Sequence, residues 1–304
     1  MPQRTAFLFP GQGSQFVGMA RDLYEQQPLA RERFREANEI LGFDLAKVCF
    51  DGPAEDLQLT ANAQPAILVH SVVACELLRA RGITPVALAG HSLGEYSALV
   101  ASGCMAFADA VRVVHLRGRF MQEAVPVGVG AMAAILGLDS TQVELACVEV
   151  IDEGVVQPAN YNCPGQIVIS GHAGAVRRAM ARCLEQGAIK VMELPVSAPF
   201  HSALMAPAAE RLQPELSHVT FSDMQVPVIS NVEAKPFGSK VVVSKLLVDQ
   251  VTAPVRWQES VQTLIQRGVE AVVEVGPGKV LSALMRRIDR TIKVVDLNQL
   301  LDAA

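Results

Sequence analysis

The sequence predicts an α/β protein in which helices flank a parallel sheet and a smaller subdomain is inserted within the chain. Two observations predict this fold. Before residue 126 and after residue 197, short apolar strand-like runs alternate with helical patterns, which is typical of a parallel sheet covered on both faces. Between residues 130 and 196 the order becomes strand, helix, two strands, helix and strand, the β-α-β-β-α-β order of a ferredoxin-like unit.

Length and composition favour an enzyme with two structural parts. The chain has 304 residues, more than one hydrophobic core usually supports. We therefore expect a large catalytic domain over 1–126 and 197–304 and a small subdomain over 127–196. Half of the residues are hydrophobic and 19% are charged, as suits a buried sheet. The formal net charge of −5 gives no indication of nucleic-acid binding.

We expect a cytoplasmic protein that binds neither a metal nor a membrane. Its six cysteines are scattered, without the spacing of a metal site, and are typical of reduced intracellular thiols. The apolar run at 6–9 stops at Pro10 and is too short for a signal sequence. No apolar run is expected to be long enough to span a membrane.

The first predicted strand, at 6–9, leads into a glycine-rich loop at 10–15. This loop lacks the Gly-Lys-Ser/Thr ending of a phosphate-binding P-loop. Gly11 and Gly13 would let backbone amides approach a bound group closely. A plain turn between a strand and a helix explains the two glycines equally well.

A second glycine-rich turn carries the strongest single motif. An apolar strand at 85–89 runs into Gly90-His91-Ser92-Leu93-Gly94, and a helix starts at once on the far side. This G-x-S-x-G pattern is that of a nucleophile elbow, a sharp turn that holds a serine hydroxyl clear of the backbone. The helix that follows aims its unpaired amides at the serine, where an oxyanion would form. We predict a nucleophilic serine at Ser92 rather than an ordinary turn.

The next helical pattern places an arginine on an apolar face. Arg117 has only apolar side chains at helical spacing, namely Val113, Val114, Phe120 and Met121. An arginine facing inward needs an anion or several acceptors, because an unpaired buried charge is costly. A guanidinium in such a place suits a substrate carboxylate. Snorkelling of the charged end to the surface explains the spacing equally well.

His201 is the histidine best placed to serve as a base for Ser92. Of the six histidines, His91 adjoins the serine but should point away from it, and the others lie within or beside regular elements. Pro199 keeps the chain out of a helix just before His201, so this histidine lies on a loop where the chain re-enters the large domain. No acidic partner is evident. A Ser/His dyad, with a backbone carbonyl orienting the imidazole, is therefore favoured.

The remaining elements follow the same alternation. In the inserted part, strands are expected at 131–136, 155–160, 166–170 and 189–194, and helices at 140–151 and 173–186. In the large domain, further strands are expected at 226–230, 271–275 and 292–297, and helices at 30–41, 66–81, 107–123, 202–216, 239–249, 256–266 and 279–288. Pro65 is placed at the start of the helix at 66–81.

Several longer motifs occur in order along nearly the whole chain. They are FPGQGSQ at 9–15, Gln64-Pro65, GHSLGEYSA at 90–98, RGRFMQ at 117–122, NYNCPGQ at 160–166, His201 and EVGPGK at 274–279. Together they resemble the malonyl-CoA:acyl carrier protein transacylases that load bacterial fatty acid synthesis. The resemblance implies a hydrolase-like α/β domain carrying an inserted ferredoxin-like subdomain.

Motif by motif, the resemblance implies roles for individual residues. Ser92 would be the acylated nucleophile and His201 its base. The backbone amides of Gln12 and Leu93 would form the oxyanion hole.

The resemblance also implies the remaining roles and the substrates. Arg117 would hold the free carboxylate of the malonyl group, and the main-chain carbonyl of Gln250 would orient the catalytic histidine. The donor would be malonyl-CoA, and the acceptor the phosphopantetheine thiol of an acyl carrier protein, with no cofactor of the protein's own. The implied cycle is ping-pong, through a malonyl-serine ester, and we expect a monomer.

Three alternatives stay open. Phe200 occupies a position where some fatty-acid enzymes of this type carry serine, and phenylalanine there also resembles free-standing malonyltransferases of polyketide synthases. A serine thioesterase or acyl hydrolase is a second possibility, and a non-catalytic docking subunit of a synthase is a third. Basic clusters at 177–182 and 286–290 could meet an acidic carrier protein, although exposed helix faces look the same.

Overall fold

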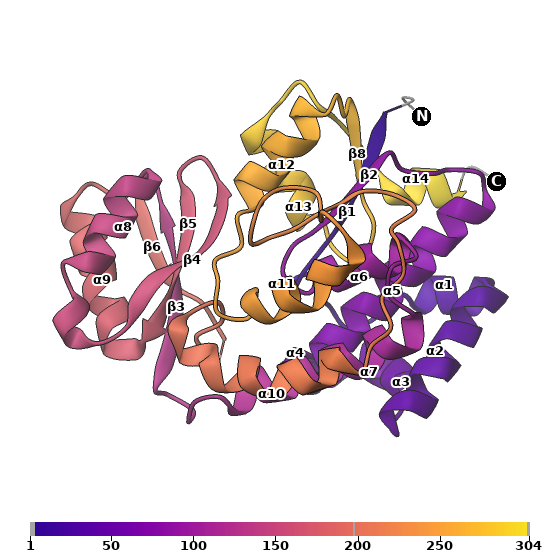
Figure 1. The fold of residues 1–304 in the computed structure, drawn as a ribbon, viewed down its shortest axis with the longest axis horizontal. Coiled ribbons are helices and arrows are strands. Elements are labelled where there is room, and N and C mark those ends of the chain that lie inside the picture. Colours follow the sequence, from indigo (N-terminus) through magenta and orange to yellow (C-terminus); the bar gives the residue numbers. More distant parts are fainter. Residues whose placement is uncertain (1–3, 197, 303–304) are drawn as a thin grey trace.

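The computed structural model describes residues 4–196 and 198–302, which form two sheets and their helices (Figure 1). The larger sheet is parallel and has the strand order β7-β2-β1-β8-β9. Its strands are β1 (Thr5–Phe9), β2 (Ala87–Gly90), β7 (Val228–Ile229), β8 (Ala271–Glu274) and β9 (Lys293–Val295). The parallel sheet predicted from the sequence is confirmed.

Most of the large domain is helical. Before the small subdomain the helices are α1 (Arg21–Gln26), α2 (Pro28–Leu41), α3 (Leu45–Asp51), α4 (Ala54–Gln58), α5 (Thr60–Ala80), α6 (Gly94–Ala101) and α7 (Phe107–Glu123). After it come α10 (Ala206–Ser217), α11 (Val243–Asp249), α12 (Trp257–Gln266), α13 (Val280–Ile288) and α14 (Leu297–Asp302), with 3₁₀ turns at Ala203–Met205 and Lys240–Val242.

Helices cover both faces of the sheet because successive side chains of a strand point to opposite sides. In β1, Phe7 and Phe9 belong to a core cluster that they share with α5, α6 and α7. Ala6 and Leu8 belong to a second cluster, shared with α12 and α13. These four side chains of β1 are fully buried.

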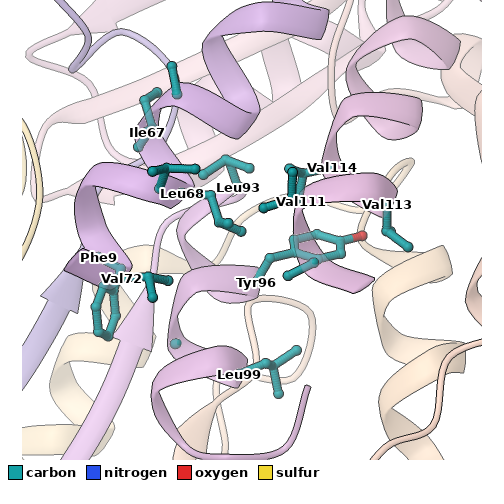
Figure 2. Packing of buried hydrophobic residues seen from close by; sticks show 14 of the residues in the cluster. Phe9, Ile67, Leu68, Val72, Leu93, Tyr96, Leu99, Val111, Val113 and Val114 are labelled. Carbon is teal, nitrogen blue, oxygen red and sulfur yellow. The ribbon is translucent and has the colours of Figure 1, made fainter. Parts of the chain in front are cut away.

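The first of these clusters holds the turn between β2 and α6 (Figure 2). The side chain of Leu93 points toward Leu68 of α5, and Tyr96 lies beside Val111 of α7. Leu93 and Tyr96 are buried, and burying a large apolar side chain contributes about 1.5–3 kcal/mol. Core packing therefore fixes the residue that directly follows Ser92.

The second sheet is antiparallel, with the order β4-β5-β3-β6, and lies at one end of the long axis of the molecule (Figure 1). The chain passes in order through β3 (Gly130–Leu136), α8 (Ser140–Val148), a 3₁₀ turn (Ile151–Glu153), β4 (Val156–Cys163), β5 (Gln166–His172), α9 (Ala173–Glu185) and β6 (Lys190–Glu193). This is the β-α-β-β-α-β order that the sequence predicted.

Backbone hydrogen bonds join the small subdomain to the large domain. The amide of Tyr161 in β4 donates to the carbonyl of Val255 at 2.9 Å, and the amide of Val255 donates to the carbonyl of Ala159 at 2.8 Å. The proposed domain limits, 1–126 with 197–304 against 127–196, stay a prediction. Residues 1–3, 197 and 303–304 lie outside the described residues.

The helix predicted at 66–81 starts earlier than expected. Helix α5 begins at Thr60, so Pro65 lies inside it and not at its start. A proline has no amide proton and therefore leaves the carbonyl four residues earlier, here that of Ala61, without its helical donor. The Nδ1 atom of His115 lies 2.9 Å from that carbonyl oxygen and supplies the missing hydrogen bond. A contact from α7 thus allows the helix to continue through the proline.

The longer α5 also corrects the expectation that no apolar run could span a membrane. By length and composition this 21-residue helix could do so, because it contains an 18-residue stretch with a mean hydropathy of 1.2. However, 83% of its apolar stretch is buried inside the protein. It is a core helix, packed against α6 and α7.

Several other element ends differ from those predicted. The strand expected at 226–230 keeps only two residues, and the one expected at 292–297 ends at Val295 and is followed by α14. The helix expected from Ser202 begins at Ala206, after a 3₁₀ turn. Helices α1, α3 and α4 were not predicted. Each has only five to seven residues, too few for a clear periodic pattern.

Candidate active site

Ser92 lies in a sharp turn between β2 and α6, at the carboxyl end of the parallel sheet. Its backbone φ is 51°, a left-handed conformation that non-glycine residues rarely adopt and that clusters at functional sites. A Cβ atom on Gly90 would lie 1.9 Å from the backbone of Gly94, and one on Gly94 would lie 2.0 Å from the carbonyl oxygen of Phe9. Glycine is therefore required on both sides of the serine.

Replacing Gly94 with alanine is expected to destabilise the protein by about 3 kcal/mol or to prevent folding, because the new methyl group meets rigid backbone. The matched control is Gly174→Ala in α9, where the added Cβ would meet no atom within 4 Å apart from its chain neighbours and the helix's own backbone. There we expect no loss, or a gain of up to about 1 kcal/mol from the better helix former. Urea unfolding of both variants measures the difference. Equal stabilities would contradict the steric account.

The structure brings His201 into contact with Ser92. The hydroxyl Oγ of Ser92 and the Nε2 atom of His201 are 2.8 Å apart. His201 is 3% exposed and, like the serine, has a positive φ, of 56°. Two residues 109 positions apart in sequence thus meet in a hydrogen bond, each held in a rare backbone conformation.

Backbone carbonyls orient the imidazole of His201. Its Nδ1 atom lies 2.9 Å from the carbonyl oxygen of Gln250 and 3.1 Å from that of Ala253. Carbonyl oxygens only accept hydrogen bonds, so Nδ1 carries the proton and Nε2 is left as an acceptor facing Ser92. Within the described ranges, no carboxylate hydrogen bonds to this imidazole.

Burial and, to a smaller extent, the nearby charge of Arg117 lower the pKa of His201 to about 3, against the opposing effect of the Gln250 carbonyl. The imidazole is therefore neutral throughout the physiological range, which is the form required of a proton acceptor.

Arg117 points inward, so the alternative of snorkelling to the surface is wrong. Its side chain is 1% exposed. Nη1 donates to Oε1 of Gln64 at 2.8 Å, and Nη2 donates to Oε1 of Gln250 at 2.9 Å and to Oγ of Ser92 at 3.1 Å. These acceptors are all neutral, and burial lowers the pKa of the guanidinium. A buried cation without a direct carboxylate partner, among the residues that the structure describes, is well suited to receive an anion.

The first glycine-rich loop packs directly on the elbow. A Cβ on Gly11 would lie 2.4 Å from the carbonyl oxygen of His91, so glycine allows the close approach. Neither the backbone amide of Gln12 nor that of Leu93 has a protein hydrogen-bond partner in the described part of the chain. Two amides beside Ser92 are thus available to a bound group.

Most of these residues line one cavity of about 430 Å³. From the large domain its walls include Gln12, Gln64, Ser92, Leu93, Arg117, Phe200 and His201, and from the subdomain Met132, Asn160, Leu194 and Pro195. A larger cavity of about 600 Å³, lined by His70, Lys279 and Asp296 among others, contains none of the predicted site residues. The smaller cavity is therefore the candidate active site.

Sequence reasoning missed Asn231, which braces the elbow. Its Oδ1 accepts from the amide of Ser92 at 2.7 Å, and its Nδ2 donates to the carbonyl of Gly90 at 2.6 Å. Nothing in the local sequence links this residue to the serine, which lies 139 positions away. His91 pairs with Asn162, at 2.9 Å, and not with Ser92.

A comparison with known proteins agrees with this geometry. Residues 6–299 match the acyl transferase domain family. The malonyl CoA-acyl carrier protein transacylase of Bacillus subtilis is 52% identical over 293 residues, covering 96% of this chain and 92% of the relative.

The chain is a member of the malonyl-CoA:acyl carrier protein transacylase family.

Solved structures of transacylases have the same fold. That of Coxiella burnetii is 42% identical, with a TM-score of 0.97, and covers 100% of this chain and 97% of that one. A malonyl-transacylase in complex with a type II PKS acyl-carrier protein is 43% identical, with a TM-score of 0.96 and coverage of 99% and 100%. The match includes both sheets, so the inserted subdomain is part of the transacylase fold, as the motifs predicted.

Proposed function

We propose that this protein transfers a malonyl group from malonyl-CoA to the phosphopantetheine thiol of an acyl carrier protein, for fatty acid biosynthesis. One observation carries the proposal. The Oγ atom of Ser92 lies between the Nε2 atom of His201, at 2.8 Å, and the Nη2 atom of Arg117, at 3.1 Å. A nucleophile, a neutral base and a buried cation meet at one atom, which suits acyl transfer of a substrate that carries a carboxylate.

In the first half of the cycle Ser92 becomes acylated. His201 takes the hydroxyl proton as Oγ attacks the thioester carbon of malonyl-CoA. The amides of Gln12 and Leu93 stabilise the negative oxygen, a contribution of about 3–4 kcal/mol for each such donor. The carbon–sulfur bond then breaks, the CoA thiolate takes the proton from His201, and a malonyl ester of Ser92 remains.

The second half repeats these steps with a different thiol. The phosphopantetheine thiol of the carrier protein gives its proton to His201 and attacks the ester carbon. When the ester bond breaks, Ser92 recovers its proton from the imidazolium and the malonyl group leaves as a thioester of the carrier. The cycle is therefore ping-pong, with one histidine acting alternately as base and acid.

The carboxylate of the malonyl group is held by Arg117. Its hydrogen-bond acceptors in the free protein are the amide oxygens of Gln64 and Gln250 and the hydroxyl of Ser92, none of which neutralises its charge. A carboxylate that enters the cavity would supply the missing anion and can accept two parallel hydrogen bonds from the guanidinium. An acetyl group offers no such partner.

The low pKa of His201 predicts that kcat/KM changes little as the pH is lowered from 8 to 5. An imidazole with the ordinary pKa of 6.5 would be only about 3% neutral at pH 5 and about 97% neutral at pH 8. With a pKa of about 3, His201 stays neutral at both values. Because kcat/KM reports groups of the free enzyme, we expect kcat/KM for the burst of CoA release from malonyl-CoA to change by less than about threefold between pH 8 and pH 5. A thirtyfold loss with a midpoint near 6.5 would contradict the assignment.

We propose that the carrier protein docks beside α13. The basic cluster at 286–290 lies at the end of α13. In the basic cluster at 177–182, by contrast, Arg177 and Arg182 already form ion pairs with glutamates. In α13, Arg287 donates to Oε1 of Gln166, at the turn between β4 and β5. This places a cation near the junction of the two domains, beside the subdomain that helps to line the cavity.

We further propose that the enzyme acts as a cytoplasmic monomer.

The deciding experiment follows the fate of the malonyl group. The protein is incubated with malonyl-CoA and with the holo acyl carrier protein of either a fatty acid or a type II polyketide system, and all proteins are weighed as intact masses. We expect a malonyl-enzyme first and then a malonyl-carrier, with little free malonate. Release of malonate without acylation of either carrier would favour a thioesterase. Acylation of the polyketide carrier alone would favour the polyketide role.

A further inference from the structure

A buried glutamate next to the elbow has no part in the proposed cycle. Glu95 lies in the first turn of α6 and is fully buried. Its Oε2 atom accepts two hydrogen bonds, from Nε2 of Gln250 at 2.9 Å and from the backbone amide of Asn231 at 3.0 Å. Burying a carboxylate is costly, so its place three residues after Ser92 calls for a physical reason.

Gln250 connects this carboxylate to Arg117. Its side-chain oxygen accepts from Nη2 of Arg117 at 2.9 Å, while its side-chain nitrogen donates to Oε2 of Glu95 at 2.9 Å and to the carbonyl of Ser92 at 3.1 Å. Its main-chain carbonyl also lies 2.9 Å from Nδ1 of His201. One buried residue therefore contacts the nucleophile, the base and the cation.

Glu95, together with the carbonyl of Ser92 and the guanidinium of Arg117, determines which way round the amide of Gln250 lies. A carboxylate only accepts hydrogen bonds, so the NH₂ group of Gln250 must face it and the oxygen must face Arg117. Burial raises the pKa of Glu95 to about 7, although the bonds from Gln250 and Asn231 and the charge of Arg117 oppose this effect. A proton would sit on Oε1, which has no partner in the described part of the chain. Oε2 then keeps both of its bonds in either protonation state.

The intervening amide also keeps the carboxylate off the guanidinium. A glutamate paired directly with Arg117 would occupy the donors that a substrate carboxylate needs. The relay through Gln250 fixes the guanidinium while occupying it with a neutral oxygen.

We propose that Glu95 is a positioning residue for malonyl selectivity, acting through the side chain of Gln250 to hold Arg117 in place for the substrate carboxylate. The inference rests on the proposed malonyl transfer. Through Asn231, which bonds to the amide of Ser92 and the carbonyl of Gly90, the same carboxylate also supports the elbow. That branch affects every acyl group equally, whereas the contact from Gln250 to Arg117 affects only substrates with a carboxylate.

The test compares acylation by malonyl-CoA and by acetyl-CoA in Glu95→Ala and Glu95→Gln. We expect Glu95→Ala to lower the malonyl-over-acetyl ratio of kcat/KM by about tenfold or more, because the side chain of Gln250 loses its charged partner and no longer holds Arg117 firmly in place. Glu95→Gln should keep the ratio within about threefold of wild type, because an amide oxygen can accept the same two hydrogen bonds. An equal fall for both substrates in Glu95→Ala would overturn the proposal, as would a loss of the ratio in both variants.

A double-mutant cycle tests whether the effect passes through Gln250. Gln250→Ala removes the side chain but keeps the main-chain carbonyl that faces His201. If Glu95 acts through it, the double variant has the same malonyl-over-acetyl ratio as Gln250→Ala alone. If the double variant instead lost the ratio by the product of the two single losses, the two residues would act independently, and the proposal that Glu95 acts through Gln250 would be overturned.

Two further variants keep the test decisive. Ser97→Ala, a change at another buried polar residue of α6, should leave the ratio unchanged. If Glu95→Ala does not fold, Glu95→Asp replaces it. The shorter side chain moves the carboxylate oxygen away from Gln250, so we expect the same fall in the malonyl-over-acetyl ratio. Wild-type protein is measured in parallel. Absence of a malonyl-enzyme there would refute the proposed function, whereas a wild-type ratio in Glu95→Asp or Glu95→Ala would refute only this inference.

Discussion

Replacing Ser92 with alanine is expected to abolish the malonyl-enzyme and to lower transfer to the carrier by a factor on the order of 10⁴–10⁶. The physical reason is that the proposed cycle has no other nucleophile. Oγ of Ser92 is the atom that both His201 and Arg117 contact. Substrate binding and the amides proposed to form the oxyanion hole would remain, but no ester could form. Intact-protein mass after incubation with malonyl-CoA measures the effect.

Ser202→Ala is a suitable control, because this serine is also buried and its hydroxyl donates to the carbonyl of Pro199. The control should still gain one malonyl unit at a rate within about tenfold of wild type, since only one structural hydrogen bond is lost. A malonyl adduct on the Ser92→Ala protein would contradict the assignment of Ser92 as the nucleophile. Absence of the adduct from both variants would point to damaged folding instead, which thermal unfolding would reveal.

Replacing Arg117 with alanine is expected to change which acyl group the enzyme accepts. We expect kcat/KM for malonyl-CoA to fall about 10²–10³-fold, which corresponds to roughly 3–4 kcal/mol for the loss of charge-assisted hydrogen bonds to the carboxylate. Acetyl-CoA has no carboxylate and should lose far less. The malonyl-over-acetyl preference, measured from rates of CoA release, should therefore collapse.

The matched control for this change is Arg112→Ala, on the same helix. Arg112 is partly exposed and forms an ion pair with Glu215 at 2.5 Å, and such surface pairs contribute about 0–1 kcal/mol. We expect its malonyl preference to equal that of wild type. If Arg117→Ala kept the wild-type preference, the carboxylate would have to be bound elsewhere in the cavity.

Local sequence was sufficient for the parts of the site that depend on neighbours along the chain. The G-x-S-x-G pattern predicted the elbow because its two glycines are required by backbone contacts within and beside the same turn. The apolar neighbours of Arg117 were likewise compatible with an inward face, which helical spacing alone could not distinguish from snorkelling. Pro199 marked the loop that carries His201.

The helix α5 shows where local rules give the wrong answer. Proline usually stands in the first turn of a helix, so the sequence predicted a start near residue 66. The observed start at Thr60 depends on His115, which belongs to α7 and bonds to the Ala61 carbonyl. A hydrogen bond from another element thus overrides a local preference, and the sequence around the proline does not indicate this bond.

The sequence by itself therefore determined the fold class, the family and the sharp turn at Ser92, because these rest on periodicity and on motifs that are continuous in the chain. Only the tertiary structure decided how the site is held together. Asn231 lies 139 residues from Ser92, and Gln250 lies 155 residues from Glu95. Their hydrogen bonds are made by side chains that folding alone brings within 3 Å of one another, and sequence spacing carries no information about such distances.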